Sequence, residues 1–140
     1  MNWRLCIVII TMLTACSSPD ISIEDAWIRS PLPGRTMTAG YLVINNPTNT
    51  DITLVGATSD VFSAVSIHQT KLINNMAQMV PVPSLEIGAG KNAVFSPGGL
   101  HLMLMQPQRT VVDGEVVTLT LEFSDGSQRQ TAALVSDTAP

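Results

Sequence analysis

Residues 97–105 read Pro-Gly-Gly-Leu-His101-Leu-Met103-Leu-Met105, and this segment decides how the chain folds. Proline followed by two glycines indicates a turn, and the residues after it alternate as a β-strand does. Side chains two positions apart in a strand point to the same face. We expect the two leucines to enter the core, which leaves His101, Met103 and Met105 on the outer face or rim.

The rest of the chain also predicts short strands. Hydrophobic or alternating runs bounded by turn residues occupy 21–28, 39–45, 51–55, 64–68, 76–82, 93–95, 115–123 and 128–135. No stretch has sustained helical periodicity with caps. Eight or nine strands at this spacing predict an all-β fold, an antiparallel Greek-key β-sandwich that forms a single domain over residues 21–136.

Composition limits the classes of function. The 140 residues suffice for one domain with a real core, in which aliphatic residues must replace aromatics, because aromatics make up only 4%. The net charge is −4 and there is no basic run. Nucleic-acid binding through phosphate contacts is therefore not expected.

The first residues read as an export signal. Arg4 precedes the apolar run 5–13, which is too short to span a bilayer. Leu-Thr-Ala-Cys16 follows and resembles the lipobox of bacterial lipoproteins. The resemblance implies a signal peptide over 1–15, lipidation of Cys16, a tether over 16–20 and a periplasmic protein on a lipid anchor. Ser17 favours the outer membrane. The alternative is an ordinary signal peptide with a chance cysteine.

Cysteine use excludes two further possibilities. Cys6 belongs to the signal and Cys16 carries the lipid, so the domain has no thiol. It therefore has no internal disulfide, although the compartment would permit one. It also lacks the cysteine ligand that a blue-copper electron carrier needs.

Histidine and methionine gather in one part of the chain. Both histidines, and four of the five methionines outside residues 1–15, lie between His68 and Met105. Thioether sulfur favours Cu(I), and imidazole also binds copper. The pattern favours a soft-metal site, against the alternative that the methionines fill gaps in the core.

The spacing of these residues resembles the periplasmic copper chaperones of the PCu(A)C family, whose ligand pattern is H-x10-M-x21-H-x-M. His68, Met79, His101 and Met103 fit this pattern without a gap. The similarity extends to Ala-Trp at 26–27, Tyr-Leu-Val-Ile-Asn at 41–45, the segment 97–105 and Leu-Thr-Leu-Glu-Phe at 119–123. It implies a cupredoxin-like β-sandwich that binds Cu(I) through these four side chains.

The sequence departs from the family in three places. Gln69 stands where methionine is frequent, Asn74-Asn75 replaces a common Asp-Gly turn, and the C-terminal tail lacks histidine and methionine. These changes leave the four ligands intact but argue against a second copper site in the tail. The pattern leaves the roles of Met37, Met76 and Met105 open, with Met105 expected in the core or supporting the ligands.

The resemblance also implies a function. A monomeric Cu(I) carrier would deliver copper to an acceptor, a cytochrome c oxidase subunit or another copper chaperone, for assembly of the Cu(A) centre. Two alternatives stay open: a lipoprotein that sequesters copper for tolerance, and a structural β-sandwich without metal. We do not expect an enzyme, because no nucleophile–base pair stands out and four protein ligands leave no open metal position.

Overall fold

The computed structural model describes residues 18–140, and these form only strands, turns and loops. The predicted signal peptide and Cys16 lie outside the described residues. Over residues 18–140, no helix is long and apolar enough to cross a membrane.

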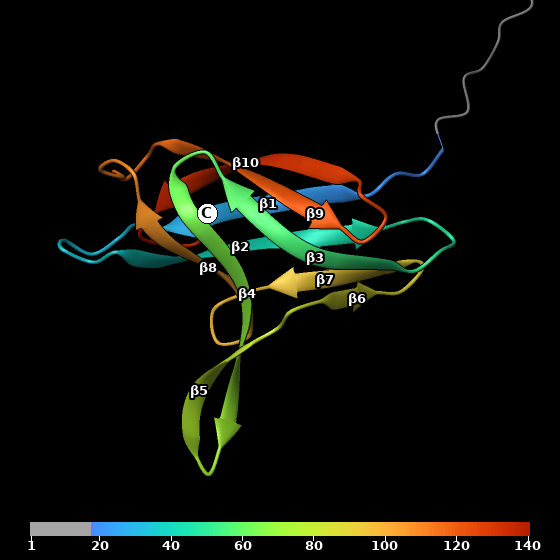
Figure 1. The fold of residues 1–140 in the computed structure, drawn as a ribbon, viewed down its shortest axis with the longest axis horizontal. Coiled ribbons are helices and arrows are strands. Elements are labelled where there is room, and N and C mark those ends of the chain that lie inside the picture. The colour runs from blue at the N-terminus through green and yellow to red at the C-terminus, as the bar shows by residue number, and fades with distance from the viewer. Residues whose placement is uncertain (1–17) are drawn as a thin grey trace, which may run out of the picture.

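Ten strands follow one another along the chain (Figure 1). They are β1 (Ser22–Arg29), β2 (Met37–Asn46), β3 (Ile52–Ser59), β4 (Phe62–Ile73), β5 (Met76–Pro81), β6 (Leu85–Ile87), β7 (Lys91–Phe95), β8 (Leu100–Pro107), β9 (Val116–Phe123) and β10 (Gln128–Ser136). The predicted strands are all present. β6 was not predicted, and β4 continues five residues beyond His68, where its expected end lay.

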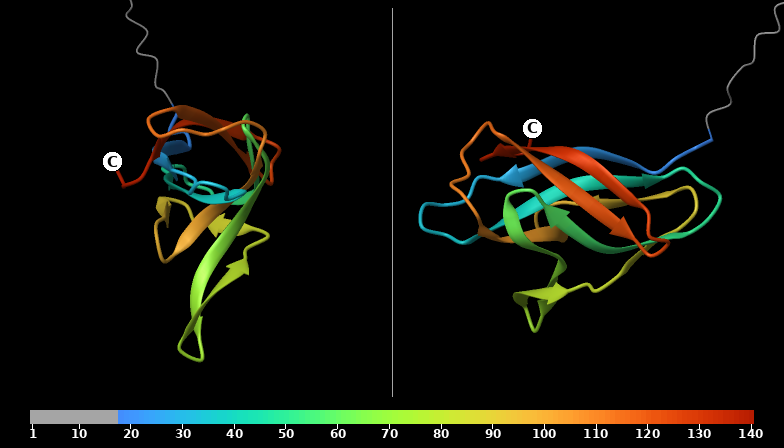
Figure 2. Two further views of the ribbon diagram at one scale, coloured as in Figure 1. Left: turned by 90° about the vertical axis from the view of Figure 1, so that its left-hand side faces the viewer. Right: turned by 45° about the horizontal axis from the view of Figure 1, so that its top comes forward.

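All ten strands belong to one continuous sheet in the order β5-β4-β8-β7-β2-β1-β10-β9-β3-β6, with β8 also paired to β2. The sheet curls on itself, as the end-on view in Figure 2 shows, and the result is a sandwich around one core. The expected all-β sandwich is confirmed. Its pairings are antiparallel except for β1 with β10 and the single pair between β7 and β8, which are parallel.

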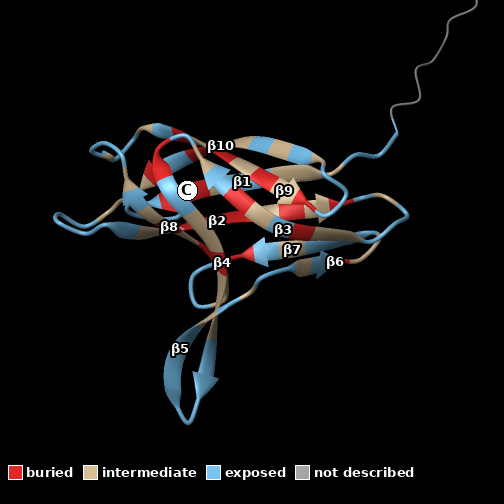
Figure 3. Cartoon of the chain, in the orientation of Figure 1, coloured by how far each residue is buried: buried red, intermediate tan, exposed pale blue. Residues whose placement is uncertain are grey.

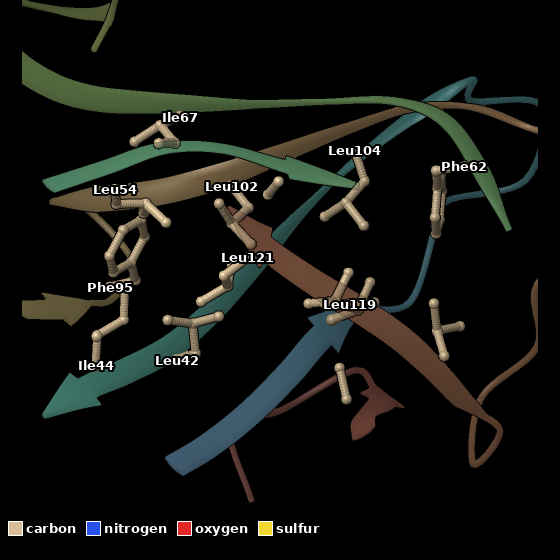
Figure 4. Packing of buried hydrophobic residues seen from close by; sticks show 14 of the residues in the cluster. Leu42, Ile44, Leu54, Phe62, Ile67, Phe95, Leu102, Leu104, Leu119 and Leu121 are labelled. Atoms are coloured by element: carbon tan, nitrogen blue, oxygen red, sulfur yellow. The ribbon is translucent and has the colours of Figure 1, made fainter. Parts of the chain in front are cut away.

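Aliphatic side chains from facing strands fill the core (Figure 4). Leu102 and Leu104 of β8 are fully buried among residues of β2, β3, β4 and β9, as the alternation in β8 predicts. Each buried leucine is worth about 1.5–3 kcal/mol relative to an exposed one. The core cluster contains no methionine, so the interpretation that methionines fill gaps in it is wrong.

A two-stranded arm extends from the sandwich. The last four residues of β4, 70–73, pair only with β5, and Asn74 and Asn75 join the two strands with φ angles of 52° and 60°. Two consecutive residues in this left-handed region are typical of a type I′ hairpin turn, which asparagine tolerates. Most of the arm is exposed, as Figure 3 shows.

Candidate metal centre

The turn before β8 places His101 and Met103. Gly98 has φ of +82°, a conformation that favours glycine, and the Ser96 N–H bonds to the Leu100 carbonyl at 2.9 Å to close the turn. Since Leu102 and Leu104 are held in the core, His101 and Met103 must share the opposite face of β8.

His101 is more deeply buried than its sequence suggests. The outer face or rim was expected, but the side chain is only 5% exposed. Side chains of other strands surround it, because His68 of β4 lies directly opposite and Met37 of β2 and Met79 of β5 line the same hollow. The alternation in β8 alone does not predict this burial.

One ring nitrogen of His101 is fixed by the backbone. Its Nδ1 lies 3.1 Å from the Gly99 carbonyl oxygen, which also accepts the Thr70 N–H at 3.1 Å. A carbonyl can only accept, so Nδ1 carries a proton and Nε2 is the nitrogen left to bind a metal. That Nε2 is buried and has no hydrogen-bond partner. Metal-bound histidines are typically oriented in this way by their other nitrogen.

His68 lies directly opposite His101 in the β4–β8 ladder. The ring centres are 6.0 Å apart and the planes are tilted by 39°. With metal–nitrogen bonds of about 2 Å, two imidazoles on opposite sides of one ion have ring centres about 6 Å apart. Burial, and secondarily the electrostatic effect of His101, lower the pKa of His68 below its ordinary value of 6.5. Both causes favour the neutral ring, the form that binds metals.

His68 also has an unpartnered nitrogen, because its Nδ1 is buried without a hydrogen bond. Buried polar atoms in folded proteins nearly always have a partner, and an exception calls for an explanation such as a bound ion. Two such imidazole nitrogens on directly opposed residues fit a shared metal ion.

A hollow of about 200 Å³ lies beside His101. Its lining consists of Met37, Thr38, Ala39, Met79, His101 and Met103. Met79 comes from β5, opposite Thr70 of β4, and its side chain is 62% exposed. The structure thus brings Met79, His101 and Met103 together at one hollow, with His68 opposite His101.

Sequence reasoning missed Met37. Its role was left open and the predicted strand began only at residue 39, yet Met37 is the first residue of β2, opposite Met105 of β8. Its neighbour on the same face, Ala39, lies opposite Met103. This arrangement depends on the pairing of strands more than 60 residues apart in sequence, roughly half of the chain. No local pattern near residue 37 indicates it.

The remaining methionines, Met105 and Met76, differ in their positions relative to the core and the hollow. Met105 shares the face of Met103 but lies outside the hydrophobic core, so of its two expected roles the place in the core is wrong and support of the ligands stays a prediction. Met76 begins β5 and is 60% exposed, and it does not line the hollow. Met76 and Met79 are therefore similarly exposed residues of one strand, and only one of them lies at the candidate site.

The ligand types restrict the metal. Within residues 18–140, no three His, Cys, Asp or Glu side chains are grouped so that they could hold an ion. The side chains that stand ready to complete the coordination of a metal at His101 are the thioethers of the hollow. Methionine sulfur is a soft ligand suited to Cu(I) and poorly suited to Mg²⁺ or Ca²⁺.

Comparison with known proteins places the chain in a family. The sequence profile of the family described as "Putative lipoprotein LpqE-like" matches residues 21–135. A protein of Leifsonia xyli subsp. xyli, described as "Putative lipoprotein Lxx21020", is 33% identical over 118 residues, which are 84% of this chain and 70% of that protein.

Solved structures agree on the fold. The copper-bound PCuAC domain from PmoF2 has a TM-score of 0.71 at 24% identity, covering 87% of this chain and 97% of its own. The Cu(I) form of DR1885 from Deinococcus radiodurans has a TM-score of 0.70 at 30% identity, covering 89% of this chain and 83% of its own. The chain therefore belongs to the LpqE-like lipoprotein family and has the PCuAC fold that its histidine and methionine spacing indicated.

Proposed function

We propose that this protein is an extracytoplasmic Cu(I) chaperone whose ligands are His68, Met79, His101 and Met103. The observation that carries the proposal is the pair of buried imidazole nitrogens, Nδ1 of His68 and Nε2 of His101, that lack partners beside a thioether-lined hollow. Unpartnered imidazole nitrogen and thioether sulfur together are the donors that a Cu(I) ion uses.

Two solved relatives support the metal assignment. One is described as a copper-bound PCuAC domain and one as Cu(I)-loaded DR1885. The second is 30% identical to this chain over 89% of its length. Residues 18–140 contain no cysteine, so a thiolate does not compete with the proposed ligands.

The four residues would have different tasks. His101 is held by the Gly99 carbonyl and by the buried leucines of its strand, so it supplies a fixed ligand. Met79 lies on the exposed arm, where β5 pairs only with β4 and is free of core contacts. An acceptor's ligand can therefore replace Met79 first, while the buried side of the site keeps the ion. Such stepwise exchange moves copper without a change of oxidation state.

The recipient and the location follow from the sequence resemblances. The PCu(A)C resemblance supports delivery to cytochrome c oxidase for its Cu(A) centre, directly or through another copper chaperone. The LpqE-like family description and Cys16 support a periplasmic lipoprotein. Ser17 supports anchoring in the outer membrane. A protein that only carries an ion requires no catalytic residue.

Metal binding is tested by anaerobic titration of residues 16–140, with Cys16→Ser, against a chromophoric Cu(I) chelator. We expect one Cu(I) per chain and much weaker Cu(II) binding. Met79→Ser should weaken Cu(I) binding by about tenfold or more, since ligand shells tune metal affinity on this scale. Met76→Ser is the matched control on the same strand and should leave binding unchanged. Equal losses in the two variants would contradict the assignment of Met79.

Delivery is tested separately. Cu(I)-loaded protein is mixed with an apo fragment of cytochrome c oxidase that carries the Cu(A) ligands, and the Cu(A) absorption is followed after oxidation. Transfer within minutes supports delivery. Retention of copper at equilibrium, with binding intact, would instead indicate sequestration. Absence of Cu(I) binding in the titration would favour the alternative that the protein is a structural β-sandwich without metal.

A further inference from the structure

Met37 is the thioether of the hollow that the four-ligand site leaves unused. It lines the hollow together with Met79, His101 and Met103, whereas His68 does not belong to that lining. The hollow therefore presents three thioethers and one imidazole, which is a complete donor set for a soft ion.

A role in packing does not explain Met37. The side chain is 53% exposed and lies outside the hydrophobic core. Methionine is among the residue types most often buried. An exposed methionine at a hollow that already contains two others calls for another explanation.

Met37 also marks the boundary of a second hollow. A neighbouring depression of about 340 Å³ is lined by Arg29, Ser30, Leu32, Arg35, Met37, Thr38 and Ala39. The segment 37–39 is common to both linings. Met37 therefore lies between the candidate copper site and an adjacent depression at the surface.

We propose that Met37 is an additional Cu(I) ligand that replaces His68 during exchange. In this step a bond forms between Cu(I) and the Met37 sulfur, and the bond to the His68 nitrogen breaks. The ion stays Cu(I), and no electron or proton is transferred between the two ligands. The proposal rests on the proposed function and adds a second coordination set, Met37, Met79, Met103 and His101, on the solvent side of the first.

The first test observes the side chain directly. The protein is labelled at the methionine ε-methyl carbons and titrated with Ag(I), a soft ion that is not redox active, and then with Cu(I). The Met37 methyl resonance should move together with those of Met79 and Met103. Met76, which is 60% exposed against 53% for Met37, is the internal control and should not move. A Met37 resonance that, like that of Met76, does not move when the metal is added overturns the proposal.

The second test uses variants. Met37→Leu and Met76→Leu keep an apolar side chain of similar volume and remove the sulfur. Each is made alone and with His68→Ala. Met37→Leu should slow Cu(I) transfer to the chelator several-fold, and in the His68→Ala background it should lower affinity by about tenfold. Identical behaviour of the two leucine variants in both backgrounds overturns the proposal, and failure of the unsubstituted protein to bind Cu(I) overturns the proposed function itself.

Discussion

Removing His101 should stabilise the protein without copper, whereas removing the other buried polar side chain should destabilise it. Among residues 18–140, the buried polar side chains are Asn46, 1% exposed, and His101, 5% exposed. Asn46 is fully used, because its Nδ2 donates to the carbonyls of Thr50, Ile87 and Gly88 at 2.8–3.1 Å and its Oδ1 accepts from Thr48. His101 makes one hydrogen bond and leaves Nε2 without a partner.

The magnitudes follow from this difference. Asn46→Leu removes several hydrogen bonds worth about 1 kcal/mol each and leaves buried carbonyls unpaired, so it should cost about 2–4 kcal/mol. His101→Leu loses one bond of about 1 kcal/mol, and the Gly99 carbonyl keeps the Thr70 N–H. It also removes a buried unpaired nitrogen that costs about 1–3 kcal/mol. The free energy of unfolding should therefore rise by about 0–2 kcal/mol.

Urea unfolding of the two variants and the unsubstituted protein, with and without Cu(I), measures these effects. With m of about 2 kcal/mol per molar urea, Asn46→Leu should lower the midpoint by roughly 1–2 M, and His101→Leu should keep or raise it. Saturating Cu(I) should then make the unsubstituted protein more stable than His101→Leu, because copper at 100 times its Kd adds about 2.7 kcal/mol to a protein that binds it. Loss of more than about 1 kcal/mol in metal-free His101→Leu would show that the ring is a satisfied core residue and refute the reasoning.

Three further predictions concern β8 and His68. Met103→Ser should weaken Cu(I) binding about tenfold or more and Met105→Ser far less, as measured by chelator competition; equal losses would place Met105 among the ligands. Gly98→Ala forces a side chain onto a φ of +82° and should cost about 1–2 kcal/mol in urea unfolding, although nothing lies within 4 Å of the added atom. The lowered pKa of His68 means that the unfolded chain takes up a proton first, so metal-free stability should fall as pH drops below 6.5 towards the folded pKa. His68→Gln should reduce this slope in thermal unfolding between pH 7.5 and 5, and an unchanged slope would contradict the assignment.

Alternation made most of the fold predictable. The burial of Leu102 and Leu104, and the common face of His101 and Met103, follow from the two-residue period of a strand. The three-residue strand β6 is too short to show such a period, and it was missed. The parallel pairing of β1 with β10 brings the two ends of the domain together, and only the whole sheet determines that.

Features of the site that depend on β8 alone could be predicted from the sequence. Features that depend on the pairing of distant strands could not. His101 is buried because residues of β2, β4 and β5 surround it, so the alternation of β8 gave the correct face but the wrong exposure. Met37 reaches the hollow through the pairing of β2 with β8, and its local sequence looks like an ordinary loop. The carbonyl that orients His101 belongs to Gly99 in the preceding turn, a contact that becomes visible only with the backbone in place.

The two faces of β8 have different roles in the proposed carrier. Core packing on one face fixes the strand, and through it the positions of His101 and Met103 on the other, so tight binding on this side needs no additional ordering of the chain. Met79 and Met37 are instead more than half exposed and lie outside the core. Ligands of this second kind can be displaced at little cost to the fold. A carrier must hold its ion and also release it, and placing rigid ligands beneath exchangeable ones satisfies both requirements within one sheet.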